Sequence, residues 1–204
     1  MATTHTKELT SIWTPANIVT CIRICFIPVF MLFATETLSV LGLTPGFQAI
    51  GAFALYILLS LTDKVDGDLA RKRGEVTDFG KFLDPIADKL LVFSALLLLL
   101  TWGMVDIWSV FIILVREFLV SALRMVASAN GEVIAADKLG KAKTAVTMVA
   151  ICALLLSRAL HISTGGVNFM IATTGQALMV AAVVLTVVSG AQYFWNARHV
   201  VFRV

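Results

Sequence analysis

The sequence predicts an all-α integral membrane protein in which six transmembrane helices follow a short N-terminal interfacial segment. Apolar residues make up 59% of the 204 residues and charged residues only 14%, whereas soluble proteins average about 45–50% and about 25%. Long apolar stretches also recur without alternation, which favours helices over the strands of a barrel. This composition excludes a disordered chain, a nucleic-acid-binding domain and an ordinary soluble enzyme.

The apolar stretches define the expected helices in chain order. Residues 1–15 are polar and mixed, and we expect a cytoplasmic or interfacial segment there, at the start of a single membrane-embedded domain that covers residues 1–204. Each later stretch approaches or exceeds the roughly 17 residues that cross the hydrocarbon core. The expected spans are residues 16–35, 46–62, 83–101, 107–127, 143–160 and a stretch between 167 and 193.

Basic residues gather in alternate connections between these spans. The connections after the second, fourth and sixth spans hold Arg71, Lys72, Arg73 and Lys81, then Lys138, Lys141 and Lys143, then Arg198 and Arg203. The other connections hold Glu36, Asp106 and a single arginine, Arg158. The positive-inside rule therefore places both termini in the cytoplasm. Trp102 and Trp108 on one side, and Tyr193 and Trp195 on the other, are expected to anchor the helices at the membrane interfaces.

One charged segment, residues 63–89, does not fit an inert membrane protein. Thirteen of its 27 residues are charged, including seven of the 13 acids in the chain. Helical spacing places two sets of residues on one face each: Asp63, Asp66, Gly67, Ala70 and Arg71, then Gly80, Asp84 and Asp88. A solvated loop whose charges only set topology would explain Lys72, Arg73, Glu75 and Asp68, but not four acids in helical register.

Four neighbouring carboxylates next to a bilayer repel one another unless cations bind to them. Mg²⁺ and Mn²⁺ prefer oxygen ligands, and a pair of such ions serves displacement reactions at phosphorus. Gly67, Ala70 and Gly80 are small enough for a helix or a substrate to approach closely. The residues therefore predict a two-metal site at one end of two helices.

The pattern D-x2-D-G-x2-A-R-x8-G-x3-D-x3-D resembles the signature of the CDP-alcohol phosphatidyltransferases. All eight fixed positions match: Asp63, Asp66, Gly67, Ala70, Arg71, Gly80, Asp84 and Asp88. Four further stretches resemble the bacterial phosphatidylglycerophosphate synthases within that family: TDFGKFLDPIADKLL, VREFLVSALRMVAS, LGKAKTAVTM and SGAQYFWNAR. Asn17, Thr20 and Arg23 match N-x2-T-x2-R of the same subfamily, whereas Thr147 stands where that subfamily often has glutamine.

The resemblance implies a fold of six transmembrane helices, usually a homodimer, in the bacterial cytoplasmic (inner) membrane with the active site facing the cytoplasm. It implies transfer of the phosphatidyl group from CDP-diacylglycerol to sn-glycerol 3-phosphate, which gives phosphatidylglycerophosphate and CMP in phosphatidylglycerol and cardiolipin biosynthesis. Two divalent cations, Mg²⁺ or Mn²⁺, are then ligated by Asp63, Asp66, Asp84 and Asp88, and Asp88 is also the base. The residues expected to bind CDP-diacylglycerol are Asn17, Thr20, Gly67, Ala70, Arg71, Thr77 and Gly80.

The acceptor's phosphate needs fixed cations, and the fourth and fifth spans supply them. Arg116 and Arg124 lie eight residues apart on one helix face, and Lys141 and Lys143 begin the next span. These four residues are expected to bind glycerol 3-phosphate. Arg116 also has a structural alternative, an ion pair with Glu117 or with an acid on another helix. Because the side chain of Glu117 points about 100° away from that of Arg116, an acid on another helix is the favoured partner.

Other interpretations stay open at this point. Lys143 has a topological alternative, and Arg23 either neutralises the acid cluster or meets a phosphate of the donor. A transferase of the same fold with another acceptor, inositol phosphate or phosphatidylglycerol, has the same metal signature. A divalent-cation channel would spread its acids through the bilayer depth, whereas here they cluster at one end beside Arg71 and Lys81.

Overall fold

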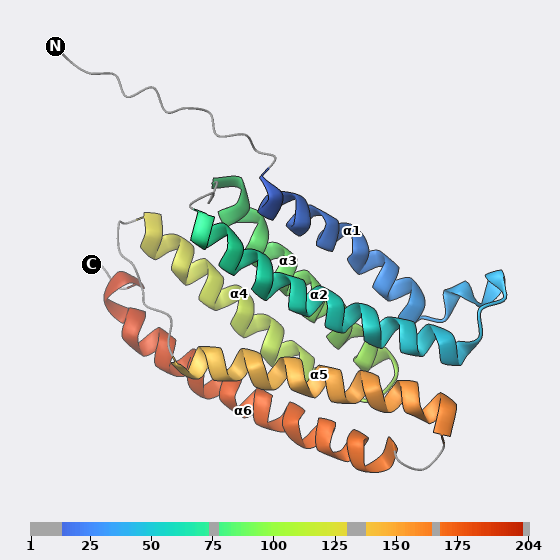
Figure 1. The fold of residues 1–204 in the computed structure, drawn as a ribbon. Coiled ribbons are helices and arrows are strands. Elements are labelled where there is room, and N and C mark those ends of the chain that lie inside the picture. The colour runs from blue at the N-terminus through green and yellow to red at the C-terminus, as the bar shows by residue number, and fades with distance from the viewer. Residues whose placement is uncertain (1–13, 74–77, 130–137, 165–167, 202–204) are drawn as a thin grey trace.

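Six long helices and one short 3-10 helix make up the protein in its computed structural model, which describes residues 14–73, 78–129, 138–164 and 168–201 (Figure 1). The elements are α1 (Pro15–Ala34), η1 (Thr37–Leu41), α2 (Pro45–Arg73), α3 (Asp78–Thr101), α4 (Ile107–Ala129), α5 (Lys138–Thr164) and α6 (Asn168–Val201). The backbone but not the side chain is described at 16, 63–73, 78, 81, 128–129, 138, 161–164, 168, 197 and 199–201. Residues 1–13, where we expected an interfacial segment, lie outside the described residues.

The helix boundaries follow from local signals in the sequence. Thr14 precedes Pro15 and caps α1, because its hydroxyl accepts a hydrogen bond from the backbone N–H of Asn17 at 3.3 Å. Asp106 caps α4 by accepting from the backbone N–H groups of Trp108 and Ser109 at 2.9 and 3.0 Å. The hydroxyl of Ser109, and to a lesser extent its backbone N–H, donate hydrogen bonds that hold the pKa of the Asp106 carboxyl below its usual value.

The six predicted spans are confirmed as helices, but several continue beyond the apolar stretch. α2 runs on through the charged residues to Arg73, α5 begins at Lys138, and Arg158 and Arg198 lie within α5 and α6. The expectation that these basic residues occupy connections was therefore wrong. Lysine and arginine are good helix formers, so a helix continues through them after the hydropathy has fallen.

Four of the helices are long and apolar enough to cross a membrane by length and composition, among the residues that the structure describes. They are Asn17–Ala34, Pro45–Thr62, Leu139–Leu160 and Phe169–Asn196. α3 and α4 each carry three charged residues within the corresponding length: Asp84, Asp88 and Lys89 on α3, and Arg116, Glu117 and Arg124 on α4. The chain is therefore a membrane protein, and the charged residues by which α3 and α4 fall short include predicted site residues.

The helices pack side by side into a closed ring. Going around it, α1 contacts α3, α3 contacts α4, α4 contacts α6, α6 contacts α5, α5 contacts α2, and α2 returns to α1. Within this ring the α5–α6 contact is the most extensive and the α3–α4 contact the least, and α3 also touches α2 and α5. Because successive helices run in opposite directions, the start of α1, the end of α2 and the start of α3 meet at one end of the bundle (Figure 1).

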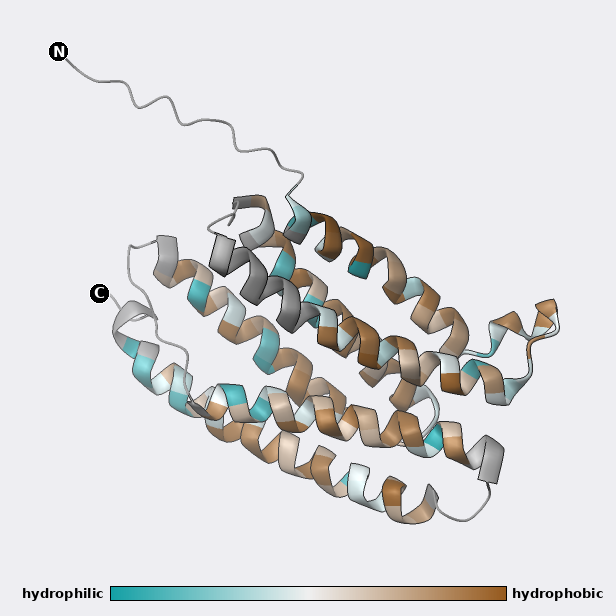
Figure 2. Ribbon diagram, viewed as in Figure 1, coloured by the Kyte–Doolittle hydropathy of each residue, from teal (hydrophilic) through white to brown (hydrophobic). Residues whose placement is uncertain are grey.

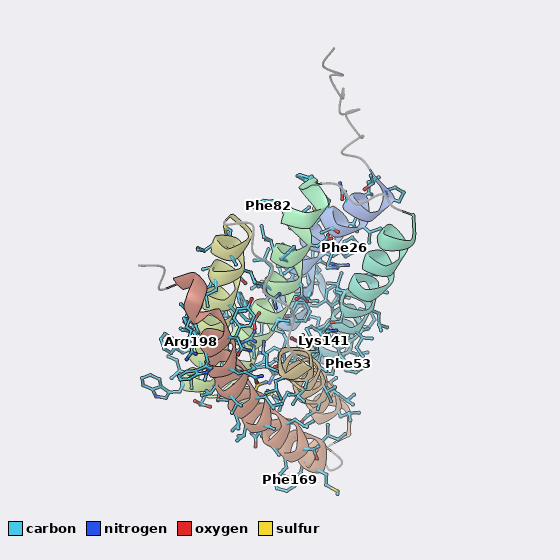
Figure 3. The ribbon with its side chains drawn as sticks, turned by 90° about the vertical axis from the view of Figure 1, so that its left-hand side faces the viewer. Phe26, Phe53, Phe82, Lys141, Phe169 and Arg198 are labelled. Atoms are coloured by element: carbon cyan, nitrogen blue, oxygen red, sulfur yellow. The ribbon has the colours of Figure 1, made fainter. Side chains whose placement is uncertain are left out.

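The apolar core fills the bundle from all six helices. Phe30 of α1 and Tyr56 of α2 are fully buried with ring centroids 5.9 Å apart, and Leu96, Ile113 and Ile151 are equally buried. Large apolar side chains also cover the outside, and Phe82 and Phe169 are exposed at opposite ends of the bundle (Figure 3). An apolar exterior of this kind suits a lipid environment.

Polar residues concentrate toward the end where α1 begins and α6 finishes (Figure 2). At the opposite end Arg158 of α5 forms an ion pair with Glu36 at 2.9 Å, and its guanidinium lies 4.6 Å from the ring centroid of Trp102. These contacts join the connection after α1, the end of α3 and α5. Trp108 is 70% exposed, as expected of an interfacial aromatic residue.

Candidate functional site

A hydrogen bond between α1 and α3 brings two distant motifs of the sequence together. The hydroxyl of Thr20 donates to Oδ1 of Asp84 at 2.8 Å, across 64 residues of sequence. Asn17, Thr20 and Arg23 recur every three residues on α1, and all three are buried. Thr20, one of the predicted donor-binding residues of α1, therefore contacts the helix that carries the second half of the acidic signature.

The acids of α3 stand on one continuous helix, as their spacing predicted. Asp84 is exposed and Asp88 is half-buried one turn later, while Gly80 is buried one turn earlier. With Oδ1 of Asp84 accepting from Thr20, the exposed carboxylate still has lone pairs for another partner. The carboxylate oxygens of Asp84 and Asp88 are of the type that Mg²⁺ and Mn²⁺ prefer as ligands.

The first half of the signature lies on α2, whose backbone is helical to Arg73. This confirms the helical register assumed for Asp63, Asp66, Gly67, Ala70 and Arg71, although their side chains lie outside the described part. Thr77 lies outside the described residues altogether. Among the described side chains, no three His, Cys, Asp or Glu residues come together. The side chains of Asp63 and Asp66, two of the four predicted ligands, are not among the described side chains.

A buried ionic network lies between α4, α5 and α6. Oε1 of Glu117 accepts hydrogen bonds from Nη1 of Arg116 at 3.0 Å and from Nζ of Lys143. Nη2 of Arg116 donates to the hydroxyl of Ser189 on α6 at 3.3 Å. Within the structural alternative for Arg116, the preference for an acid on another helix over Glu117 was therefore wrong. The long guanidinium and carboxylate side chains bend toward each other despite their diverging Cβ directions.

Two glycines lie against Arg116, and Gly190 makes room for it. A Cβ on Gly190 of α6 would lie only 3.2 Å from Cγ of Arg116, whereas a Cβ on Gly140 of α5 would lie at an ordinary contact distance of 3.5 Å from its Nη2. The buried Nε of Arg116 has no hydrogen-bond partner among the described residues. Sequence reasoning did not identify these glycines, because spacing within one helix carries no information about which neighbouring helix approaches it.

The four predicted acceptor cations differ in their surroundings. Arg124 donates through Nε to the hydroxyl of Tyr193 on α6 at 3.2 Å and lies 5.5 Å from the centroid of that ring. Tyr193 is only 3% exposed, so the expectation that it anchors the helix at the membrane interface was wrong. Lys141 is exposed, whereas Lys143 is 3% exposed and bonded to Glu117.

At the end of α6, the guanidinium of Arg198 stacks on the exposed ring of Trp195, 4.6 Å from the ring centroid.

Lys89 and Ser121 of this region were not singled out from the sequence. Lys89 of α3 donates to the hydroxyl of Ser121 on α4. Glu117, named from the sequence only as the less favoured partner of Arg116, is the acceptor for two of the cations. Thr147, the departure from the subfamily pattern, is buried and donates to the carbonyl oxygen of Lys143 within α5 at 2.9 Å. A signal was available for Lys89, which is a cation directly after a predicted metal ligand.

Comparison with known proteins identifies the family. A sequence model described as CDP-alcohol phosphatidyltransferase matches residues 13–188, which include every predicted site residue. The chain belongs to the CDP-alcohol phosphatidyltransferase family. It is 44% identical over 190 residues to a CDP-diacylglycerol–glycerol-3-phosphate 3-phosphatidyltransferase of Bacillus subtilis, covering 89% of this chain and 95% of the relative.

Two further members of the family show similar coverage. A probable phosphatidylglycerophosphate synthase of Mycobacterium tuberculosis is 39% identical over 184 residues, which is 89% of this chain and 80% of that protein. A CDP-diacylglycerol–glycerol-3-phosphate 3-phosphatidyltransferase of Rickettsia bellii is 38% identical over 178 residues, which is 87% of this chain and 92% of that protein. The phosphatidyltransferase similarity thus spans nearly the whole chain.

Proposed function

We propose that this protein transfers the phosphatidyl group of CDP-diacylglycerol to sn-glycerol 3-phosphate, giving phosphatidylglycerophosphate and CMP. The names of relatives at 38–44% identity support this reaction, and so does the chemistry of the described residues. The observation that carries it is that α3 connects the helix with predicted donor-binding residues to the helices with predicted acceptor-binding cations. α3 holds Asp84 against α1 and Lys89 against α4, where the cations of α4 and α5 lie.

The acidic signature is proposed to hold two divalent cations, Mg²⁺ or Mn²⁺, through Asp63, Asp66, Asp84 and Asp88. The exposed carboxylate of Asp84, fixed on one oxygen by Thr20, fits such a role. When bound, the ions neutralise the donor's pyrophosphate and stabilise the charge on departing CMP. Proton transfer and the binding of both substrates are assigned to side chains of this protein.

The reaction forms one bond and breaks one bond at phosphorus. A hydroxyl oxygen of the acceptor attacks the phosphorus that carries the diacylglycerol, and the bond from that phosphorus to the CMP oxygen breaks. Asp88 is proposed to take the proton of the hydroxyl, and positioning supplies much of the rate. Asn17, Thr20, Gly67, Ala70, Arg71, Thr77 and Gly80 are proposed to bind the donor. Its acyl chains then stay in lipid beside the apolar exterior.

The acceptor's phosphate is proposed to meet Arg116, Arg124, Lys141 and Lys143. Their charge exceeds that of Glu117, the acid that binds two of them. An excess of positive charge beside apolar helices is costly without an anion, and a phosphate provides one. The ion pair of Glu117 then keeps Arg116 and Lys143 in place while the acceptor is absent.

The membrane arrangement follows from the same residues. We propose that all six long helices cross the cytoplasmic membrane, with both termini and the site on the cytoplasmic side, since the basic helix ends gather there. In α3 and α4 the charged residues lie toward the site end or bond within the bundle, which lowers the cost of crossing. A homodimer is proposed from the family resemblance.

An acceptor panel tests the reaction. The purified protein is given CDP-diacylglycerol in vesicles with Mg²⁺ or Mn²⁺, and CMP release is measured with glycerol 3-phosphate, inositol phosphate or phosphatidylglycerol supplied separately. We expect product only with glycerol 3-phosphate. Product with another acceptor and none with glycerol 3-phosphate would refute the proposal and favour the alternative transferase of the same fold.

A matched pair of variants tests the metal site. Asp84→Asn should abolish metal-dependent CMP release, because a neutral amide replaces a proposed ligand. Asp106→Asn makes the same chemical change at the opposite end of the bundle, where asparagine also caps a helix well, and should keep full activity. An Asp84→Asn protein that retains full metal-dependent activity would contradict the two-metal assignment.

A further inference from the structure

We propose that Lys89 binds the phosphate of the acceptor, as a cation supplied by the same helix that carries the predicted metal ligands. This inference rests on the proposed reaction and deepens its acceptor site. It adds to that site a residue that the family signature does not include.

Lys89 lies between the two halves of the site. It directly follows Asp88 on α3, so their Cα atoms are about 3.8 Å apart, and successive helical residues diverge by about 100°. Asp84 faces α1 through Thr20, whereas Nζ of Lys89 donates to the hydroxyl of Ser121 on α4. α3 therefore presents its acid to one neighbouring helix and its ammonium group to another.

The surroundings of Lys89 favour an anion. Four charged groups lie close enough to act on its ammonium: Glu117, Asp88, Arg124 and Lys143. Glu117 is already bonded to Arg116 and Lys143, and Asp88 is assigned to the metal site. Arg124 of α4 and Lys143 of α5 thus act on Lys89 of α3 from two other helices, and the carboxylate of Glu117 is shared by two cations besides Lys89.

The size of the acceptor explains why a cation is needed at this position. In glycerol 3-phosphate only a three-carbon chain separates the attacking hydroxyl from the phosphate. When the hydroxyl is beside Asp88, the phosphate must lie within one small molecule's length of that carboxylate. Lys89 meets this condition because the carboxylate of Asp88 is close enough to act on its ammonium group. Its ammonium has three donors and gives one to Ser121, which leaves two for phosphate oxygens.

The contact with Ser121 provides the control for a purely structural role. Ser121 donates its own hydrogen bond to the carbonyl oxygen of Glu117 at 2.7 Å and carries no charge. If Lys89 serves only to tie α3 to α4, then Ser121→Ala should reproduce the effect of losing Lys89. If Lys89 binds phosphate, then Ser121→Ala keeps the ammonium and should leave the KM for the acceptor within about twofold of wild type.

The experiment measures KM and kcat for both substrates in wild type, Lys89→Gln, Lys89→Arg and Ser121→Ala. We expect Lys89→Gln to raise the KM for glycerol 3-phosphate about 10- to 100-fold, the usual effect of losing a hydrogen bond to a charged group. The KM for CDP-diacylglycerol should stay within about twofold. Lys89→Arg keeps the charge and should recover part of the loss.

Inhibition by inorganic phosphate provides a second readout. Phosphate should compete with glycerol 3-phosphate in the wild type and inhibit Lys89→Gln at least about tenfold more weakly, while Ser121→Ala stays sensitive. Equal effects of Lys89→Gln and Ser121→Ala on acceptor KM would overturn the proposal, as would an unchanged acceptor KM in Lys89→Gln. If the wild type does not use glycerol 3-phosphate at all, the proposed reaction itself fails, which is a distinguishable outcome.

Should Lys89→Gln not fold, Lys89→Met replaces it, because methionine keeps the apolar stem of the side chain and removes the charge. The acceptor KM should rise and the inhibition by phosphate should weaken together. A change in stability alone, with both constants as in the wild type, would overturn the proposal.

Discussion

Removing the carboxylate of Glu117 should destabilise the protein more than breaking an exposed ion pair would, and Glu117→Gln tests this. Its Oε1 accepts two charge-assisted hydrogen bonds, from Arg116 and Lys143. The side chains of Glu117, Arg116 and Lys143 are only 18%, 13% and 4% exposed. Removing the carboxylate leaves two buried cations without their counter-ion. Breaking a buried pair in this way costs about 3–5 kcal/mol of the free energy of unfolding.

The assay is equilibrium unfolding in mixed detergent micelles, followed by circular dichroism. A double variant, Glu117→Gln with Lys143→Met, removes a buried charge along with its partner and should be more stable than the sum of the two single changes by at least about 1 kcal/mol. Lys141→Met, two residues away and exposed, is the control and should cost less than about 0.5 kcal/mol. A cost below about 1 kcal/mol for Glu117→Gln, or strict additivity with Lys143→Met, would refute the reasoning.

Two further predictions concern the α1–α3 and α5–α6 contacts. Thr20→Val keeps the shape of the side chain but removes the donor to Asp84; it should lower CMP release about tenfold and raise the Mg²⁺ concentration needed for half-maximal rate, and an unchanged metal titration would contradict it. Gly175→Ala places a Cβ 2.9 Å from Leu154 of α5 and should lower the free energy of unfolding by about 1–3 kcal/mol. Adding Leu154→Ala should reduce the cost of that methyl group, and equal costs in both backgrounds would contradict the steric explanation.

Much of the fold could be predicted because hydropathy along one dimension reports directly on lipid burial. The helices follow the apolar stretches, and the acids at residues 84 and 88 stand in the register that their spacing required. The ends were less predictable. Because of their charge, Lys138 and Arg158 were predicted to lie in connections, but both are helical. A helix that leaves the hydrocarbon needs no apolar side chains to maintain its backbone hydrogen bonds.

The partners within the site could not be predicted in the same way. As an ion-pair partner of Arg116, an acid on another helix was favoured over Glu117, and Tyr193 was expected at the membrane interface. Instead Arg116 bonds to its neighbour Glu117, and Tyr193 is buried against Arg124. Such partners depend on which helices approach closely, and a small residue such as Gly190 permits that approach. Helical spacing reports the face on which a residue stands but not the neighbour that it meets.

The sequence by itself determined the membrane class, the helices and the eight-residue signature, because apolar length and helical register are properties of single segments. The tertiary structure decided which groups are neutralised and which remain available. It placed Thr20 on Asp84, tied Lys143 to Glu117, and directed Lys89 toward α4. The physical reason is that a buried charge is stabilised by whatever group packing brings within a few ångströms, and six helices closed into a ring bring together residues far apart in the chain.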